Sequence, residues 1–482
     1  MRILYLDIDT TRADHLGCYG YHRNTSPTLD QIASEGVTFQ NCYVTDAPCL
    51  PSRAALVSGR FGIHNGVVGH GGTAADPFIV GRERNFASNQ DRLNWAECLK
   101  RAGLHTVSIS PFAERHSAWQ FYAGYSEMYN PGKRGGERAD EVNEVALPWL
   151  QQNAQEDNWF LHVNYWDPHT PYRTPESFGN PFENDPTPDW LTEEMRQAHY
   201  DSYGPHSAQD TMGWSGGSRW PRVPDSIASM DDYRKWIDGY DVGIRYADHH
   251  VEQVLSILDE KGVLDDTVIM VSSDHGENQG ELNIYGDHHT ADNITSRVPM
   301  ILRWPGVTDT PRVDNGFHYQ FDVAATVLEM AGARVPPLWD GRSFAPTFKE
   351  GRDEGRESLV ISQMAWSCQR SVRCEEWLMM RTYHDGLKDF PPIMLFDVES
   401  DPHLLNDLTD EKPKVVNECL AILEGWHTEM MATSTQPVDP LQTVLREGGP
   451  FHTRSALESY CEHLRETGRA HHAESLMKRH GA

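Results

Sequence analysis

Residues 241–277 read DVGIRYADHHVEQVLSILDEKGVLDDTVIMVSSDHGE, and they contain one complete structural unit. Apolar side chains recur at helical spacing over 241–262, which predicts an amphipathic helix. The run 267–273 is almost entirely apolar and β-prone, which is typical of a strand buried on both faces. Asp274 and His275 follow at once, so the unit is a helix, a buried strand and then two polar side chains.

The same alternation continues on both sides of this unit. Further strand patterns occupy 3–8, 105–110, 159–166 and 299–304, and further helical patterns occupy 27–36, 91–103 and 139–153. Near-continuous apolar strands separated by helices predict an α/β fold, in which a large mixed, mostly parallel sheet is flanked by helices.

The pattern changes after residue 345. Strand-like runs at 358–366, 375–383 and 393–398 are joined by short loops, and a helical pattern over 412–432 follows them. We therefore expect a main α/β domain over 1–345, a small α+β subdomain with a largely antiparallel sheet over 346–439, and a helical tail over 440–482. A polar tail helix is typical of an oligomer arm, which suggests a homo-oligomer, and a tail frayed into solvent is the alternative.

A long segment rich in Trp, Gly and Pro, residues 176–226, interrupts the main domain. Long irregular segments in compact domains tend to form lids, so we expect this insertion to shape a ligand pocket. Its Trp190, Trp214 and Trp220 suit stacking on a sugar, or ordinary packing within the lid.

The composition indicates an ordinary globular protein with an acidic surface. The 482 residues are 38% hydrophobic and 23% charged, and their formal net charge is −29. A nucleic-acid partner is not expected, because phosphate neutralisation needs clustered cations. No stretch approaches the roughly 18 uninterrupted apolar residues of a membrane span. No export-signal pattern precedes the first strand, so we expect a cytoplasmic protein with no membrane partner. The eight cysteines include no CxxC pair, which argues against a disulfide scaffold or a zinc knuckle.

Acidic and imidazole side chains follow three of the predicted strands. They are Asp7 and Asp9, Asp167 and His169, and Asp274 and His275. Ligands of open α/β sheets sit outside the carboxyl ends of the strands, so these residues predict a site at one edge of the sheet.

A lone cysteine stands in 49-CLPSR-53 at the start of a predicted helix. With Asp9, 49-CLPSR-53, 167-DPHTPY-172 and 274-DHGE-277 in this order, the chain resembles the type I sulfatases of the alkaline phosphatase superfamily. The likeness also covers 12-RADHLGCYG-20, 297-RVPMILRWPG-306 and 395-LFDVESDPHLLNDL-408, and so extends to about residue 410. It implies an alkaline-phosphatase-like fold.

The resemblance implies that a formylglycine-generating enzyme oxidises Cys49 to formylglycine, whose hydrated aldehyde is the nucleophile. A sulfate ester would transfer its sulfur to this residue, and the second hydroxyl would then expel sulfate by elimination, which a serine could not do. The expected metal ligands are Asp9, Asp274, His275 and residue 49, with Asp7 as a further ligand or as a group behind them. Ca²⁺ is the metal we expect, and the histidine at 275 also admits Mn²⁺ or Zn²⁺.

The resemblance also assigns roles to Arg53 and His169. Arg53 would hold the formylglycine hydroxyl and the carboxylates, and His169 would contact the sulfate and the leaving oxygen.

Two family features are missing. The usual GKxH segment is absent from 103-GLHTVSISPFAERHSAW-119, where Arg115 and His116 are the substitutes we expect. The usual lysine before the RVP strand is also absent, and Asp287, His288 and His289 stand there. His70 falls at a position of polar substrate contact, so His70, His116, His169, His288 and His289 together could provide acid catalysis and sulfate binding. For His288 and His289, a surface histidine is the alternative.

Three functions remain open from the sequence. The first is a formylglycine-dependent sulfatase that cleaves a small-molecule or carbohydrate sulfate ester. The second is a phosphonate monoester or phosphodiester hydrolase built on the same site. The third is an unmodified, catalytically silent metal-binding protein.

Overall fold

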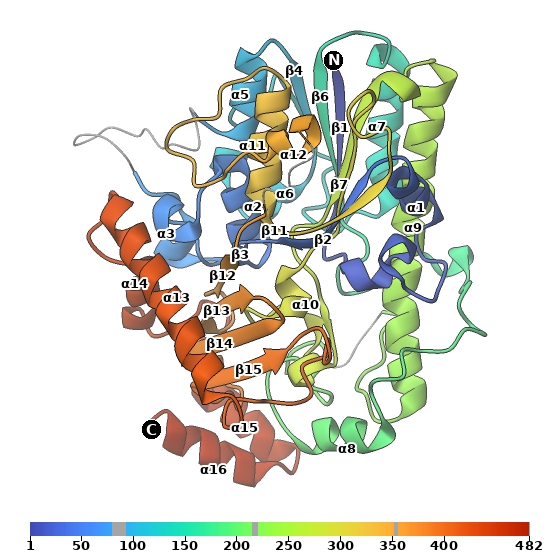
Figure 1. Cartoon of the computed structure of the whole chain (residues 1–482). Coiled ribbons are helices and arrows are strands. Elements are labelled where there is room, and N and C mark those ends of the chain that lie inside the picture. The colour runs from blue at the N-terminus through green and yellow to red at the C-terminus, as the bar shows by residue number, and fades with distance from the viewer. Residues whose placement is uncertain (80–92, 215–219, 351–354, 482) are drawn as a thin grey trace.

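The computed structural model describes residues 1–79, 93–214, 220–350 and 355–481 (Figure 1). Within these residues, the main sheet has eight strands. In sheet order they are β11 (Arg312–Tyr319), β2 (Val37–Tyr43), β10 (Met300–Arg303), β7 (Thr267–Ser272), β1 (Arg2–Ile8), β6 (Trp159–Tyr165), β4 (His105–Ile109) and β5 (Glu127–Tyr129). Among them β10 runs antiparallel to its neighbours β7 and β2, and the other pairs are parallel. The predicted mixed, mostly parallel sheet is confirmed.

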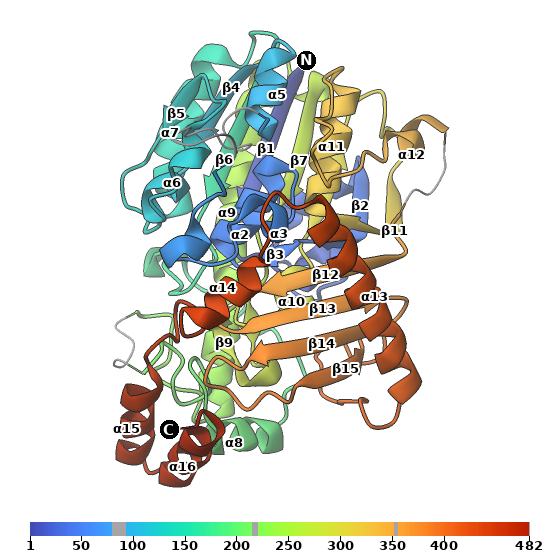
Figure 2. The same cartoon turned by 90° about the vertical axis from the view of Figure 1, so that its left-hand side faces the viewer.

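Helices cover both faces of this sheet (Figure 2). One face carries α1 (Pro27–Ser34), α7 (Ala139–Asn153) and α9 (Met230–Glu260), and the other carries α2 (Cys49–Ser58), α5 (Trp95–Arg101) and α11 (Gln320–Met330). Strand β1 serves both layers, because successive side chains of a strand point to opposite faces. Leu4, Leu6 and Ile8 join the core on the α9 side, and Ile3 and Tyr5 join the core on the α11 side.

Several predicted boundaries differ from the observed ones. The helix predicted to begin at residue 241 begins at Met230, where the side chain of Ser229 accepts from the backbone N–H of Asp232 and caps it. Strands β2, β5 and β11 were not predicted. Residues 91 and 92 of the predicted helix 91–103 lie outside the described residues.

The C-terminal part forms a second sheet, as predicted, but with more strands. Its order is β15 (Ile393–Asp397), β14 (Trp377–His384), β13 (Cys368–Cys374), β12 (Ser358–Gln363) and β3 (Asp46–Ala47). Pairs among β12 to β15 are antiparallel, and α13 (Pro413–Thr433) packs on the sheet. β13 was not predicted, because its sequence, CQRSVRC, lacks a clear apolar pattern. The short β3, which immediately precedes the CLPSR segment, joins this sheet parallel to β12.

Shorter elements fill the connections between the main ones. They are α3 (Gly62–Asn65), α6 (Phe112–Arg115), α8 (Glu193–Asp201), α10 (Asn293–Ser296), α12 (Ala345–Glu350) and the strand pair β8 (Asn278–Gln279) and β9 (Tyr285–Asp287). Helix α8 lies within the insertion 176–226, which is therefore less irregular than its sequence indicated.

The tail contains α14 (Pro440–Arg446), α15 (Leu457–Glu466) and α16 (Ala470–Arg479), and it folds back onto its own chain (Figure 2). Tyr460 of α15 accepts the backbone N–H of Gly204 in the insertion at 2.7 Å. The guanidinium of Arg469 lies 3.0 Å from Asp210 and pairs the tail with the insertion a second time. In the described part of the chain, no helix combines the length and the apolarity that crossing a membrane requires.

Candidate active site

Three adjacent strands of the main sheet end at the same edge. Asp9 follows β1, His169 follows β6 after a short turn, and Asp274 follows β7. Because β1 pairs in parallel with both β6 and β7, these carboxyl ends lie side by side. The backbone N–H of Thr10 donates to Oδ1 of Asp274 at 3.2 Å and joins two of the three loops.

Cys49, the first residue of α2, lies at this edge. Its side chain is buried, and its Sγ lies 3.0 Å from Nε2 of His275. One turn into the helix, the hydroxyl of Ser52 donates to the backbone carbonyl of Asp274 at 2.5 Å. The chain before Cys49 is held by the pairing of β3 with β12. Both sheets therefore fix the position of residue 49.

Arg53 connects three carboxylates next to Cys49. Its guanidinium donates to Asp7, to Oδ2 of Asp9 at 2.8 Å and to Oδ2 of Asp274 at 3.1 Å. Asp7 lies in addition 3.0 Å from Nε2 of His162. The structure thus places Asp7 between two nitrogen groups of the protein, outside the group of potential metal ligands described next.

Asp9, Cys49, Asp274 and His275 form a buried group whose ligand atoms all lie within 4.8 Å of one another. Oδ1 of Asp9 is buried and has no hydrogen-bond partner. Nδ1 of His275 donates to the carbonyl of Gly276 at 2.8 Å, which leaves the lone pair of Nε2 directed to this group.

The electrostatics of the group favour a bound cation. Burial and the nearby Asp274 raise the pKa of Asp9 well above its usual range. Burial also raises the pKa of Asp274, but the charges of Arg53 and His275 outweigh it, so that the pKa of Asp274 is lowered. One guanidinium therefore does not fully compensate the two carboxylates. Two carboxylates, an imidazole and residue 49 fit a divalent metal.

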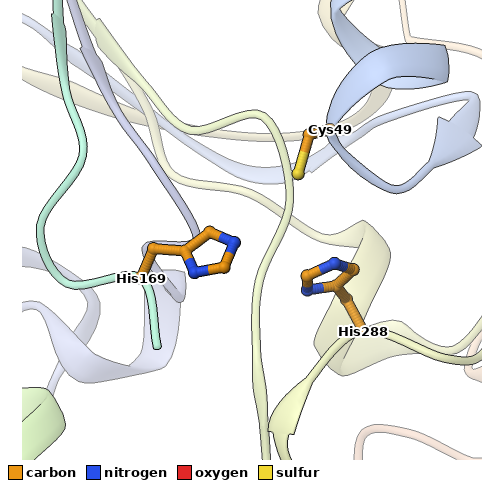
Figure 3. Close-up of side chains that lie close together, drawn as sticks. All are labelled: Cys49, His169 and His288. Carbon is orange, nitrogen blue, oxygen red and sulfur yellow. The ribbon is translucent and has the colours of Figure 1, made fainter. Parts of the chain in front are cut away.

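Two further histidines lie beside Cys49 (Figure 3). One ring nitrogen each of His169 and His288 and the Sγ of Cys49 also lie within 4.8 Å of one another. Burial, followed by the charge of Arg173, lowers the pKa of His169 to about 3. Burial and the charge of His275 lower the pKa of His288 well below its usual value.

The next layer consists of partly exposed side chains. Nδ1 of His70 lies 2.9 Å from Nε2 of His452, which belongs to the tail. The rings of His70 and His116 are 5.0 Å apart, and burial lowers the pKa of His116 to about 3. Arg115 is exposed and has its guanidinium 5.8 Å from the ring of Trp166. The structure therefore brings the predicted residues 70, 115 and 116 to one neighbourhood.

His289 belongs to a different group of possible ligands, with His206 and Asp287. Its ring stacks on Trp366 at 4.0 Å, and its Nε2 lies 3.5 Å from Asp287. Asp287 also lies 3.2 Å from Nε2 of His206, a residue of the insertion, and 3.3 Å from Nε2 of His288. His289 is buried with its neighbours, so the surface alternative does not hold for it or for His288.

Sequence reasoning missed several residues of this region. Arg173 directly follows the DPHTPY motif, and its charge affects both His169 and Asp9. Glu277 of the DHGE motif accepts from the hydroxyls of Tyr172 and Thr170 at 2.8 and 2.9 Å. Both lie within or beside a recognised motif and could have been singled out. His452 lies 382 residues from its partner His70 and gives no local signal.

Comparison with known families agrees with this geometry. The sulfatase family model matches residues 2–333, and the model described as N-sulphoglucosamine sulphohydrolase, C-terminal, matches residues 280–426. The chain belongs to the sulfatase family. As a sulfatase it is a hydrolase of sulfate esters, and members of its family use a metal and a formylglycine.

The relatives of this sulfatase are distant in sequence. It is 22% identical to an N-acetylglucosamine-6-O-sulfatase of Bacteroides thetaiotaomicron, over 92% of this chain and 89% of the relative. It is 23% identical to a choline-sulfatase of Rhizobium meliloti, with 80% and 78% of the two chains covered.

Solved structures share the fold. A protein in complex with its substrate D-glucosamine-2-N,6-O-disulfate has a TM-score of 0.70 at 19% identity, with 90% of this chain and 99% of that chain covered. A phosphonate monoester hydrolase from Silicibacter pomeroyi has a TM-score of 0.68 at 18% identity, with 90% and 96% covered.

Proposed function

We propose that this sulfatase cleaves a small-molecule or carbohydrate sulfate ester with a formylglycine made from Cys49. The observation that carries the proposal is the position of Sγ of Cys49, 3.0 Å from His275 and within 4.8 Å of ligand atoms of Asp9 and Asp274. A nucleophile at this position is surrounded by groups that suit a divalent metal, which would polarise the nucleophile and the sulfate oxygens. Asp9, Asp274, His275 and residue 49 would hold that metal. Ca²⁺ fits the carboxylates, and the imidazole also suits Mn²⁺ or Zn²⁺.

The proposed reaction has two steps at residue 49. One hydroxyl of the hydrated aldehyde attacks sulfur, the bond between sulfur and the alcohol oxygen breaks, and the alcohol takes a proton from a histidine. The remaining hydroxyl then loses its proton, its oxygen forms the aldehyde carbonyl, and the bond that holds sulfate breaks. Water restores the hydrated aldehyde, and no attack by water on sulfur is needed.

The surrounding side chains have separate tasks in this scheme. Arg53 holds the carboxylates of Asp9 and Asp274 in place, and its ring contact with Phe112 at 4.8 Å limits its movement. His169, His288 and His116 are the candidates for the proton donor. Their pKa values are lowered by burial, so the donor must gain its proton when the anionic substrate arrives.

Arg115, His70 and His289 are proposed to contact the substrate or its binding loops. The names of distant relatives favour a sugar or a small alcohol as the part that leaves, since they include an N-acetylglucosamine-6-O-sulfatase and a choline-sulfatase.

Mass spectrometry of the Cys49 peptide tests the nucleophile. Protein produced together with a formylglycine-generating enzyme should show the fixed mass loss that accompanies replacement of the thiol by an aldehyde. Cys49→Ala should fold and lose essentially all turnover of an aryl sulfate. A persistent thiol in active protein, or activity in Cys49→Ala, would refute the formylglycine role. A persistent thiol in inactive protein would instead support a catalytically silent metal-binding protein.

A second candidate is a phosphonate monoester or phosphodiester hydrolase that uses the same residues. The absence of the GKxH segment and the pairing of Asp274 with His275 support it. Turnover of an aryl sulfate and of an aryl phosphonate, measured on one preparation, distinguishes the two: we expect the sulfate to have the higher kcat/KM.

A further inference from the structure

Two arginines near His169 have no anionic partner in the part of the chain that the structure describes. Arg173 lies four residues after His169, and Arg115 is the last residue of α6. Each guanidinium lies 5.8 Å from the centre of a tryptophan ring, Trp166 for Arg115 and Trp220 for Arg173. Among the described residues, neither guanidinium makes a hydrogen bond or an ion pair.

Both arginines belong to the surroundings of the nucleophile position. His169 lies beside Cys49 (Figure 3), and the ring of Trp166 stacks on His169 at 5.5 Å. Burial lowers the pKa of His169, and the charge of Arg173 makes the next largest contribution. Burial also lowers the pKa of Arg173, and the charge of Arg115 lowers it further. Two like charges are therefore held near one another at the edge of the site.

The acidic side chains whose charges reach Arg173 are held by other groups. Asp167 and Glu137 each accept a backbone N–H at 2.8 Å, and Asp9 accepts from Arg53 at 2.8 Å. None of the three forms an ion pair with Arg173. A half-buried guanidinium without a counter-charge is unfavourable, so the site lacks an anion when no substrate is bound.

A third donor lies in the same cluster. The indole Nε1 of Trp166 is buried and has no hydrogen-bond partner. An indole N–H and a guanidinium only donate, and a guanidinium presents its donors as a planar fork. Such a donor set suits the oxygens of a carboxylate or a sulfate.

We propose that Arg115 and Arg173 bind a second anionic group of the substrate, located on the alcohol part that leaves. This group is a carboxylate or a further sulfate, because both offer paired oxygens to an arginine. The inference rests on the proposed function and narrows it, since the sugar or small alcohol then carries a negative charge of its own.

The charge of the whole chain supports a dedicated role for these cations. The formal net charge is −29, so an anionic substrate is repelled by most of the surface and needs local positive charge to bind. The alternative is that both arginines hold the scissile sulfate in place of the missing GKxH segment. The two possibilities differ in which substrates depend on the arginines.

Three derivatives of 4-nitrophenyl sulfate test the proposal. They carry a neutral carbamoyl, a carboxylate or a sulfonate group at ring position 3, so they differ mainly in the second charge. Wild type should have a kcat/KM at least about tenfold higher for one charged derivative than for the carbamoyl derivative, mainly through a lower KM. Preference for the carboxylate or for the sulfonate identifies the anionic group.

Substitutions then assign the preference to the arginines. Arg173→Met should lower kcat/KM for the preferred charged derivative at least about tenfold, and for the carbamoyl derivative less than about threefold. Arg173→Lys should lose less, because it keeps the charge. Arg245→Met is the matched control: Arg245 is 27% exposed and is paired with Asp248 at 2.9 Å, so all three values should stay within about twofold of wild type.

Two results would overturn the proposal. Equal losses for all three derivatives in Arg173→Met would show that the arginine holds the scissile sulfate instead. A wild-type protein that does not prefer either charged derivative would show that no second anionic group is recognised.

Binding to the Cys49→Ala protein separates this inference from the proposed function. Calorimetry with the same derivatives requires no turnover. Tighter binding of a charged derivative, lost on adding Arg173→Met, together with an unmodified and inactive wild type would refute the function and leave the anion site standing. Formylglycine-dependent turnover of all three derivatives with equal kcat/KM would refute the anion site and leave the function standing.

Discussion

Replacing Arg53 with methionine should destabilise the metal-free protein much more than the metal-loaded protein. Methionine keeps most of the length and the apolar contact with Phe112, but it removes the only guanidinium that bridges Asp7, Asp9 and Asp274 in the described structure. The side chain of Arg53 is 6% exposed, so its loss leaves buried carboxylates without a counter-charge. A divalent cation can compensate Asp9 and Asp274, while Asp7 keeps its contact with His162.

The expected loss of stability follows from the removal of one buried counter-charge. Removing one partner of a buried ion pair costs about 3–5 kcal/mol, which we expect in the presence of EDTA. With saturating Ca²⁺ the loss should fall to about 1.5–3 kcal/mol, the value of a charge-assisted hydrogen bond. If the main domain unfolds as one unit of about 345 residues, the melting temperature should fall by about 4–7 °C without metal and by about half of that with metal. Differential scanning calorimetry measures both.

Arg370 provides the matched control. Its guanidinium makes a bidentate pair with Asp439 at 2.6 and 2.8 Å, and its side chain is 3% exposed, but this pair involves none of the proposed metal ligands. Arg370→Met should lower the melting temperature by a similar amount whether or not Ca²⁺ is present. An equal loss with and without Ca²⁺ in Arg53→Met would contradict the view that Arg53 and a metal share the compensation of Asp9 and Asp274.

Three further predictions concern the region around the site. His452→Ala removes the hydrogen bond to His70 and should raise KM for an aryl sulfate about fivefold with little change in kcat. The reason is that one neutral hydrogen bond contributes about 1 kcal/mol. An unchanged KM would contradict a role of this pair in contacting the substrate. Burial lowers the pKa of Lys388 to about 7. The free-energy cost of burying its charge is therefore fully present below pH 7 and fades between pH 7 and 10.5. Lys388→Met should have a higher melting temperature than wild type at pH 6, and this difference should shrink towards pH 10. Asp210→Asn removes the charge that compensates Arg469. Hydrogen exchange of the backbone amides in α15 and α16 should then become at least about tenfold faster. An exchange rate equal to that of wild type would show that the pair does not anchor the tail.

The sequence predicted the parts of the site that depend on local patterns. Asp9, His169 and Asp274 each follow an apolar strand, and parallel neighbours end at a common edge, so their proximity could be inferred before the fold was known. Cys49 and Arg53 lie within one helical turn of each other and were placed by their motif. These inferences need only the strand pattern and the spacing along the chain.

Other parts depend on how distant segments pack. Asp7 lies two residues before Asp9, on the same face of the strand, so the sequence did not distinguish it from the metal ligands. Its contacts with Arg53 and His162 in the structure make that distinction. His452 reaches His70 only because the tail turns at Gly448 and Gly449, both of which have positive φ, and folds back on the main domain. No periodicity in the sequence encodes that path.

The domain boundary predicted at residue 345 does not separate the site from the rest of the chain. Strand β3 has two residues, too few to hold a position alone, and it gains its partner from β12 of the small sheet. At the end of β12, Gln363 donates to the carbonyl of His288, and soon after it Ser367 donates to the carbonyl of His289. One short segment of the C-terminal sheet therefore positions both the chain before Cys49 and the backbone of His288 and His289. Because the nucleophile and these histidines depend on the same strand, a disturbance in the small sheet should displace them jointly, and the first 345 residues alone do not contain the complete site.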